Sequence, residues 1–250
     1  MEQESDFEQA RLAGMLSLRR SEERGVIGVK KERSLHAVLK YWLEPNEGYH
    51  ERKLPCGLIA DIFDGERVIE VQTGSFYRLR PKLERLLPLY PVTVVYPIAH
   101  KKRLIWVGEG GELSAPHTSP KKGEIWDVTP ELVSIPKYLS HENLTLRLVL
   151  LEVDEYRALD GWSKDKKKGS HRLERIPTAV CRDETLHGLS DYRRLLPKGL
   201  PDPFMTADIA KACRRRGKFP QQLIYSLYSS GVIIRTGKKG NAYLYRVSEG

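Results

Sequence analysis

Apolar residues in the first part of the chain recur at helical spacing. The segment from Asp6 to Arg24 mixes Glu, Arg and Leu with little strand character, which predicts one exposed helix. From Glu32 to Trp42, apolar residues recur three and four positions apart. This spacing predicts a second helix whose apolar stripe consists of Leu35, Val38, Leu39 and Trp42. A different face of the same helix carries Glu32, His36 and Lys40.

Strand-like spacing follows. After a short strand-like stretch at Tyr49–Leu54, the chain has two runs rich in strand-forming residues, Gly57–Phe63 and Arg67–Thr73. Asp64-Gly65-Glu66 separates them, and Asp-Gly between such runs is a strong hairpin signal. The two runs are therefore expected to pair as antiparallel strands.

The next segments complete an α/β order. Leu79–Leu87 is predicted to be a short helix, and Pro91–Ile98 and Arg103–Val107 to be buried strands. A helix, three meandering strands, a helix and a strand predict a restriction-endonuclease-like mixed α/β sheet flanked by helices. The strand after the second helix is expected to return beside the meander.

The middle of the chain has weaker patterns. Gly108–Lys122 is typical of a loop or a long hairpin tip, and a helix is expected to start at Thr129. Leu144–Val153 predicts one more buried strand. We expect a basic, irregular linker from residue 156 to 202, in which the run Lys164–Lys168 is a solvated loop or, alternatively, contacts nucleic acid.

The last part of the chain predicts two helices followed by two strands. Thr206 caps a helix at Ala207–Cys213, and Pro220 opens a second helix that ends before Gly231. Strands are expected at Val232–Arg235 and Ala242–Val247, joined by a basic, glycine-rich tip. The predicted organisation has four parts: a helical extension at 1–30, an α/β domain at 31–155, the linker at 156–202 and a small C-terminal domain at 203–250.

Composition indicates an ordinary globular protein that stays inside the cell. The 250 residues are 40% hydrophobic and 30% charged. No apolar run approaches the roughly 20 residues that cross a bilayer, and the acidic N-terminus is unlike a signal peptide. We therefore expect a soluble, cytoplasmic protein without a membrane partner. The cysteines Cys56, Cys181 and Cys213 are far apart, so reduced thiols are expected rather than a zinc site.

The positive charge is concentrated near the C-terminus. The formal net charge is +9, and residues from Pro197 onward contribute ten Lys or Arg against three Asp or Glu, which is +7 of that total. Such an imbalance favours a polyanionic partner. Duplex DNA is the partner that we expect.

The hairpin brings candidate chemistry together. Side chains alternate along a strand, so Glu70 and Gln72 share one face while Ile69 and Val71 share the other. If the hairpin loop has an even number of residues, Asp61 lies on the same face as Glu70, either opposite it or one diagonal step away. Two carboxylates held this close would be relieved by a hard cation, for which Mg²⁺, or Mn²⁺, is the expected cofactor. The alternative is that Asp61 and Glu70 are simply exposed polar positions on a half-buried hairpin.

The helix with Glu32, then Asp61, then Glu70-Val71-Gln72, then a helix and a strand, resembles the PD-(D/E)XK nuclease superfamily over about residues 32–98. The resemblance implies a catalytic set of Asp61, Glu70, Gln72 and Glu32. In it, Asp61 and Glu70 are the metal ligands, and Glu32 is an outer or additional ligand.

The sequence departs from that family at two positions. Gln72 stands where the family usually has lysine, and glutamine offers only dipoles where lysine would supply a positive charge. Ala60 stands where a proline often precedes the first Asp. Lys82 on the following helix is a candidate substitute for the missing lysine, and His36 and Lys40 are further accessory candidates.

Residues 204–247 resemble a winged helix, with a predicted recognition helix that begins near Pro220. Basic residues at the turn and at the wing would contact phosphates, and polar residues of the recognition helix would reach base edges in the major groove. The predicted DNA-binding residues are Arg214, Arg215, Arg216, Lys218, Gln221, Gln222, Tyr225, Lys238 and Lys239. The alternative is a winged helix used for protein contacts.

Three functions are therefore compared. The first is a magnesium-dependent deoxyribonuclease, an endonuclease-like hydrolase delivered to DNA by a winged helix; a homodimer would suit an enzyme that cuts both strands. The second is a DNA-binding regulator whose nuclease-like domain lacks catalysis, which Gln72 favours. The third is a protein-interaction adaptor.

Overall fold

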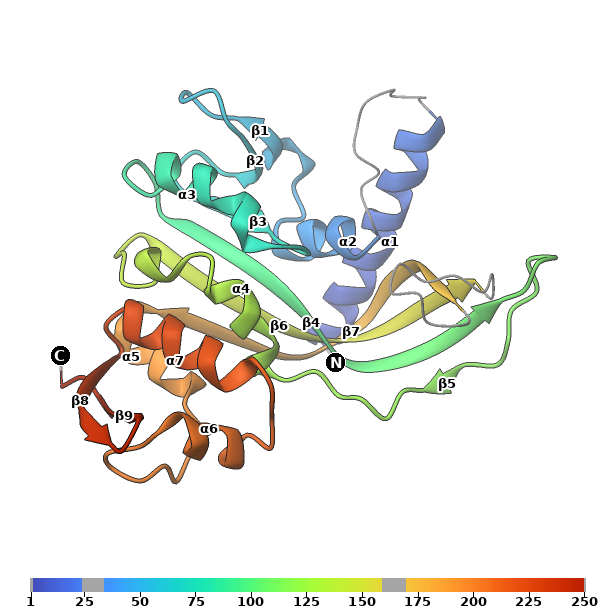
Figure 1. The fold of residues 1–250 in the computed structure, drawn as a ribbon. Helices are drawn as coiled ribbons and strands as arrows, with labels where there is room; N and C mark the ends of the chain where they lie inside the picture. The colour runs from blue at the N-terminus through green and yellow to red at the C-terminus, as the bar shows by residue number, and fades with distance from the viewer. Residues whose placement is uncertain (1, 24–33, 159–169, 250) are drawn as a thin grey trace.

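A mixed β-sheet is the centre of the molecule. The computed structural model describes residues 2–23, 34–158 and 170–249. Within these residues the sheet has seven strands in the order β1-β2-β3-β4-β6-β7, with β5 pairing to β4 (Figure 1). The pairs β3–β4 and β4–β6 are parallel and the others are antiparallel. The strands are β1 (His50–Lys53), β2 (Ile59–Phe63), β3 (Val68–Val71), β4 (Val92–Val107), β5 (His117–Thr118), β6 (Leu144–Ala158) and β7 (His171–His187).

Helices cover both faces of this sheet. The helices are α1 (Glu2–Glu23), α2 (Ser34–Leu43), α3 (Arg80–Leu86), α4 (Thr129–Leu132), α5 (Gly188–Tyr192), α6 (Thr206–Ala212) and α7 (Phe219–Ser229). On one face, Val38 and Leu39 of α2 pack with Ile69 of β3 in one apolar cluster. On the other face, Leu83 of α3 and Leu132 of α4 belong to a second, larger cluster. The expected mixed α/β sheet with flanking helices is therefore confirmed.

The hairpin and the returning strand have the expected pairing. Ile62 pairs with Ile69 and Phe63 with Val68, so β2 and β3 are antiparallel. The strand that follows α3 returns beside the meander, where β4 runs parallel to β3. None of the described helices is both long and apolar enough to cross a membrane.

Two sequence-based expectations about strands were wrong. Pro91–Ile98 and Arg103–Val107 are not separate strands, because β4 continues through them, with an irregularity in its pairing to β6 between Ala99 and Lys101. A bulge of this kind bends a strand without ending it. The linker expected at 156–202 instead contains the 17-residue strand β7, paired to β6. The run Lys164–Lys168 lies outside the described residues.

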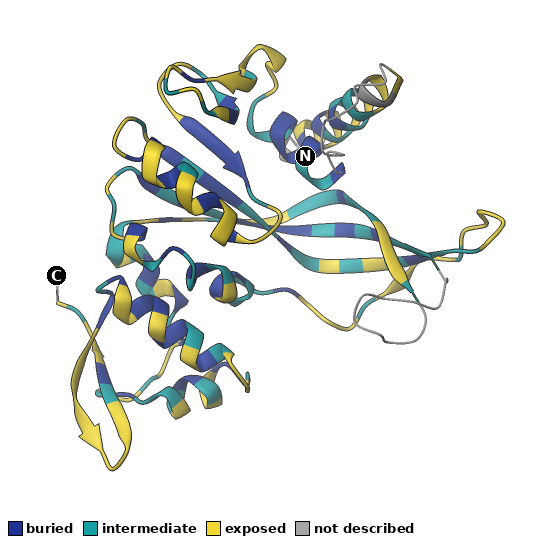
Figure 2. Cartoon of the chain, turned by 45° about the horizontal axis from the view of Figure 1, so that its top comes forward, coloured by how far each residue is buried: buried dark blue, intermediate teal, exposed yellow. Residues whose placement is uncertain are grey.

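The C-terminal part consists of helices followed by a two-stranded hairpin. Helices α6 and α7 are joined by a basic turn, and β8 (Ile233–Lys239) pairs with β9 (Ala242–Val247) in antiparallel fashion. The two helices and two strands expected in this region are confirmed, but Met205, not Thr206, precedes the first helix, and β8 continues through Lys239 into the expected tip. Leu223 and Leu227 of α7 share the larger apolar cluster with Leu132 and Leu139, so this part and the sheet have one continuous core. Figure 2 shows the contrast between the mostly exposed β8–β9 hairpin and the fully buried β3.

Candidate functional site

Strands β2 and β3 place two carboxylates side by side. The β2–β3 pairs are Ile62–Ile69 and Phe63–Val68, and Asp61 and Glu70 are the next residue on each strand. The backbone N–H of Val71 donates to Asp61 Oδ2 at 2.8 Å, and the N–H of Asp61 faces Glu70 Oε1 at 3.4 Å. The loop between the strands has four residues, so the even-loop condition for a shared face is met.

The hairpin turn fixes this register locally. Asp64 Oδ1 accepts the backbone N–H groups of Glu66 at 3.0 Å and Arg67 at 2.9 Å. Gly65 has φ of 106°, a left-handed conformation that glycine adopts without steric cost. Buried Val68 then anchors the start of β3. The Asp-Gly turn is therefore the element that aligns Asp61 with Glu70.

Two basic side chains reach the carboxylates from the flanking helices. Lys82 of α3 places Nζ 2.5 Å from Glu70 Oε2, and His36 of α2 places Nε2 3.1 Å from Asp61 Oδ2. Glu70 is only 4% exposed, which contradicts the alternative of an exposed polar position. The structure thus brings together Asp61, Glu70, His36 and Lys82.

Asp61 and Glu70 have different pKa values because their neighbours differ. Burial and the negative charge of Asp61 raise the pKa of Glu70 from 4.5 to about 7, although Lys82 opposes the shift. Burial also raises the pKa of Asp61, but hydrogen bonding and charge from His36, the charge of Lys82 and the N–H of Val71 outweigh it, so the pKa falls below its usual value. Asp61 is the more acidic member of the pair, and Glu70 exchanges its proton near neutral pH.

Other predicted site residues lie elsewhere. Gln72 directly follows β3, and its Nε2 donates to the backbone oxygen of Ser75 at 3.0 Å, in the turn that leads to α3. The buried Lys40 pairs with Glu51 Oε1 at 2.7 Å instead of with the carboxylate pair. Glu32 lies outside the described residues.

The carboxylates can supply oxygen ligands to a metal ion. No group of three or more His, Cys, Asp or Glu side chains suited to a metal occurs in the part of the chain that the structure describes. Mg²⁺ needs fewer, because it usually keeps several waters and takes one or two carboxylates together with substrate phosphates. Asp61 Oδ1 and Glu70 Oε1 are not the oxygens that contact His36 and Lys82, although the N–H of Asp61 faces Glu70 Oε1.

The basic residues of the C-terminal part differ in their surroundings. Arg215 donates to Asp127 Oδ1 at 2.6 Å, and its guanidinium lies over the rings of Trp126 and Phe219. This places Arg215 at the junction with the sheet. The remaining predicted phosphate contacts are exposed: Arg214, Arg216, Lys218, Lys238 and Lys239.

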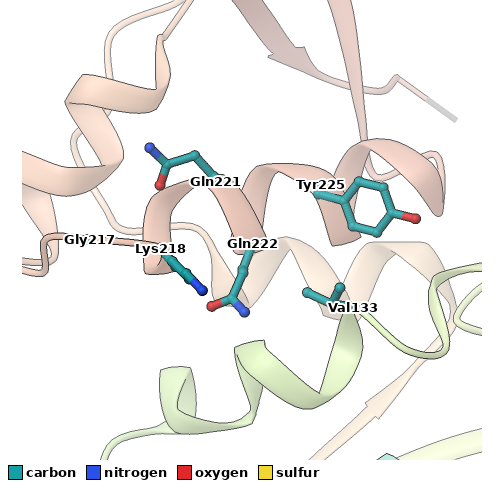
Figure 3. Close-up of a pocket in the computed structure, with 6 residues that line it drawn as sticks. All are labelled: Val133, Gly217, Lys218, Gln221, Gln222 and Tyr225. Atoms are coloured by element: carbon teal, nitrogen blue, oxygen red, sulfur yellow. The ribbon is translucent and has the colours of Figure 1, made fainter. Parts of the chain in front are cut away.

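The predicted recognition helix borders a hollow of about 390 Å³. Its lining includes Lys218, Gln221, Gln222 and Tyr225 of the C-terminal part together with Val133, which follows α4. Figure 3 shows Lys218 and Gln222 directed toward α4, whereas Gln221 is directed away. One side of α7 therefore faces the main body of the protein.

Sequence reasoning missed an aromatic–cation cluster on the β8–β9 hairpin. Arg235 lies 4.4 Å from the ring centre of Tyr228 and 4.1 Å from that of Tyr243, and Lys238 lies 4.7 Å from Tyr243. The alternation of Tyr243 and Tyr245 in β9 was the available signal, since it places both rings on one face.

Comparison with known proteins identifies a family without assigning an activity. A family model described as a domain of unknown function, DUF8091, matches residues 33–187, and the chain belongs to this family. The match ends at the last residue of β7. The chain is also similar to an uncharacterized protein of Treponema pallidum (strain Nichols), with 28% identity over 225 residues that cover 88% of this chain and 87% of the relative. No solved structure matches the chain.

Proposed function

We propose that this protein is a magnesium-dependent, endonuclease-like hydrolase that cleaves phosphodiester bonds in duplex DNA. The observation that carries the proposal is that Asp61 and Glu70 lie next to each other, one residue beyond the last β2–β3 pair, with Lys82 in contact with Glu70. The order of sheet and helices supports a restriction-endonuclease-like core.

Each side chain has a role in this proposal. Asp61 and Glu70 would hold the magnesium ion, which polarises a phosphodiester and acidifies a bound water. His36 orients Asp61 through its contact with Oδ2. Glu70, with a pKa of about 7, is deprotonated readily enough at neutral pH to act as a ligand.

Lys82 supplies the positive charge that Gln72 cannot. Its ammonium has three N–H donors, and one contact to Glu70 leaves others for a phosphate oxygen. A cation at this position stabilises negative charge that develops on the phosphate in the transition state. Gln72, by contrast, directs its amide N–H to Ser75. The missing lysine of the β-strand is thus replaced by one from α3.

The C-terminal part would deliver the site to DNA as a winged helix. Its helix–turn–helix and β8–β9 hairpin supply the required order of elements, and their exposed Arg and Lys suit phosphate contacts. Because Arg215 is bound to Asp127, phosphate contact at the turn is assigned to Arg214 and Arg216.

A DNA-binding regulator without catalysis is the second candidate. The favouring observation is that Lys82 and His36 already offer positive or hydrogen-bonding partners to both carboxylates. These partners offset the negative charge of the carboxylates without a metal ion, as in a purely structural ion pair.

Cleavage assays distinguish these candidates. Purified protein is incubated with plasmid and linear DNA, with and without Mg²⁺ or Mn²⁺, beside the variants Asp61→Asn, Glu70→Gln and Lys82→Gln. Metal-dependent cleavage should fall at least about a hundredfold in each variant, by loss of a metal ligand or of transition-state charge. The control is Glu66→Gln, since Glu66 is exposed at the turn of the same hairpin, and it should cleave normally.

Three outcomes would contradict the proposed site or the nuclease itself. Cleavage that survives both Asp61→Asn and Glu70→Gln would place the chemistry elsewhere. No metal-dependent cleavage, together with salt-sensitive duplex binding that Arg214→Ala with Arg216→Ala abolishes, would establish the regulator. Absence of both cleavage and DNA binding would favour the adaptor.

A further inference from the structure

A polar pocket lies on the sheet beyond the carboxylate pair. It has a volume of about 180 Å³, and three segments form it: β4 from Tyr96 to Lys102, the connection from β5 to α4, and β7. The connection contributes Lys121, Gly123 and Asp127, and β7 contributes Arg175. A water molecule takes up about 30 Å³ in the liquid, so the pocket can hold a phosphate group together with a few waters.

Positive charge exceeds negative charge in and around this pocket. The buried carboxylate of Glu155 is shared by two arginines, Arg157 and Arg175, at 2.7 Å each. Asp127 is bound by Arg215. Glu155 and Asp127 are therefore already matched by arginines before the lysines of the pocket are counted, and the third nearby acid, Glu131, accepts the backbone N–H of Phe76.

Lys102 and Lys121 supply the unmatched charge. No hydrogen bond or ion pair of either ammonium group is found among the described residues. Burial and the nearby Arg175, Lys121 and Arg157 lower the pKa of Lys102, although Glu155 opposes them. An anion bound between these groups would relieve their mutual repulsion.

The rest of the lining suits an oxyanion. Burial and the neighbouring acids Glu131 and Asp127 raise the pKa of Tyr96 to about 12, so its hydroxyl stays protonated and can donate a hydrogen bond. Gly123 keeps the wall close to β4, because a Cβ added there would lie 2.5 Å from the backbone oxygen of Ala99. The pocket is thus a shaped set of donors and cations.

Strand register connects the pocket to the carboxylate pair. Glu70 pairs with Val94, and Tyr96 and Ile98 follow on the same face of β4. At about 3.3 Å per residue, these two positions lie about 7 and 13 Å beyond the level of Glu70. Arg175 also borders a second hollow that contains Thr73, the residue after Gln72. A strand of nucleic acid at the carboxylates could therefore extend into the pocket.

We infer that this pocket binds a backbone phosphate of the DNA strand that passes the carboxylate pair, held by Lys102, Lys121 and Arg175. The inference rests on the proposed function for the choice of nucleic acid. It adds a phosphate site on the α/β domain, separate from the basic turn and hairpin of the C-terminal part.

Equilibrium binding without metal tests this site independently of cleavage. Fluorescence anisotropy of a labelled duplex is measured in EDTA at several salt concentrations, for the wild type and for Lys102→Gln with Lys121→Gln. Each lost phosphate contact should make the slope of log affinity against log salt less negative by about 0.9, so the double variant should lose about 2 in slope and bind roughly tenfold more weakly. Lys102→Arg with Lys121→Arg should retain the wild-type slope, because the charges remain.

A matched control lies next to the pocket. Lys122 is exposed and is not part of the lining, so Lys122→Gln should bind like the wild type. The inference is overturned if the double variant has the same affinity and salt slope as Lys122→Gln while its circular dichroism is unchanged. A second result would also overturn it. If inorganic phosphate raises the unfolding temperature of the wild type but not of the double variant, while both bind the duplex equally, the pocket binds a free anion and not DNA. Wild-type binding without cleavage would reject the nuclease, and a weaker double variant in the same experiment would still support this phosphate site.

Discussion

At the scale of single residues, the unequal acidity of Asp61 and Glu70 is the main property of the candidate site. Both are carboxylates just beyond the last β2–β3 pair, but Asp61 accepts a backbone N–H and contacts His36, whereas Glu70 is more deeply buried. The difference arises from neighbours that come from α2 and α3. Sequence parity could place the two acids together, but it could not predict which one would keep its proton.

This difference predicts a pH-dependent effect of Glu70→Gln on stability. The folded-state pKa of Glu70 is raised, so its contribution is fully present below about pH 4.5 and is lost as pH rises through about 7. In EDTA, the free energy of unfolding of the variant relative to wild type should therefore rise between pH 4.5 and 8 by on the order of 3 kcal/mol, since one pKa unit corresponds to about 1.4 kcal/mol. Urea denaturation across this range measures it, with Glu66→Gln as control. A difference independent of pH would contradict the raised pKa.

The site was only partly predictable from its residues. Asp61 and Glu70 followed from alternation and loop length, which are local rules. Lys82 was identified as a substitute for lysine at position 72, but its contact with Glu70 depends on how α3 packs. Lys40 shares a helix with His36, yet it pairs with Glu51 in the segment after the helix. Helical spacing shows which residues share a helix face, but not which residues of other elements they contact.

At the scale of elements, strong local patterns were found and weak ones were missed. The β2–β3 hairpin and α7 have clear apolar periodicity and clear turn signals. Strand β7 has mostly exposed or half-buried positions, because it lies at the sheet edge and faces β6 through charged pairs such as Arg147–Asp183. An edge strand with charged side chains lacks the apolar alternation on which sequence prediction depends.

The close contact between α1 and α2 predicts that Gly14→Ala lowers stability, the opposite of its effect in an isolated helix. A Cβ on Gly14 would lie 2.8 Å from the backbone of Val38, so α1 approaches α2 closely at this point. In an isolated helix, Gly→Ala is stabilising by up to about 1 kcal/mol. Here Gly14→Ala should destabilise the α1–α2 contact by about 1–3 kcal/mol, because the added methyl overpacks it. Hydrogen exchange of α1 amides measures the effect.

Gly74→Ala provides the comparison for this substitution. Its added Cβ would meet only the end of the Gln72 side chain, at 3.9 Å, so exchange in α1 should be unchanged. Slower exchange of α1 in Gly14→Ala would show that helix propensity outweighs packing, and the close contact would then be absent in solution.

At the scale of the whole molecule, the sheet and the C-terminal part share one apolar cluster. Leu223 and Leu227 join it from α7, and Leu132 and Leu139 from the region of α4. The Arg215–Asp127 ion pair crosses the same junction. The sequence predicted a separate domain at 203–250 because the charge and the order of elements change there. Neither feature shows that apolar residues on the two sides of this boundary pack in one core.

This continuity predicts unfolding as one cooperative unit. Cys213 is buried in the C-terminal part and provides a probe, once the other thiols are removed by Cys56→Ser and Cys181→Ser. Labelling of Cys213 should begin at the same urea concentration at which circular dichroism reports loss of the sheet, as two-state behaviour requires. Labelling at clearly lower urea would show that the C-terminal part opens separately.

The four-residue turn between β2 and β3 also constrains how this family can change during evolution. If one residue is added there and the turn keeps four residues, the strand register shifts by one and the side chains of one strand turn to the opposite face. A turn of a different length, or a bulge, avoids that shift. Relatives that keep both acids but differ by one residue at this position should therefore have a turn of another length or a bulge beside it.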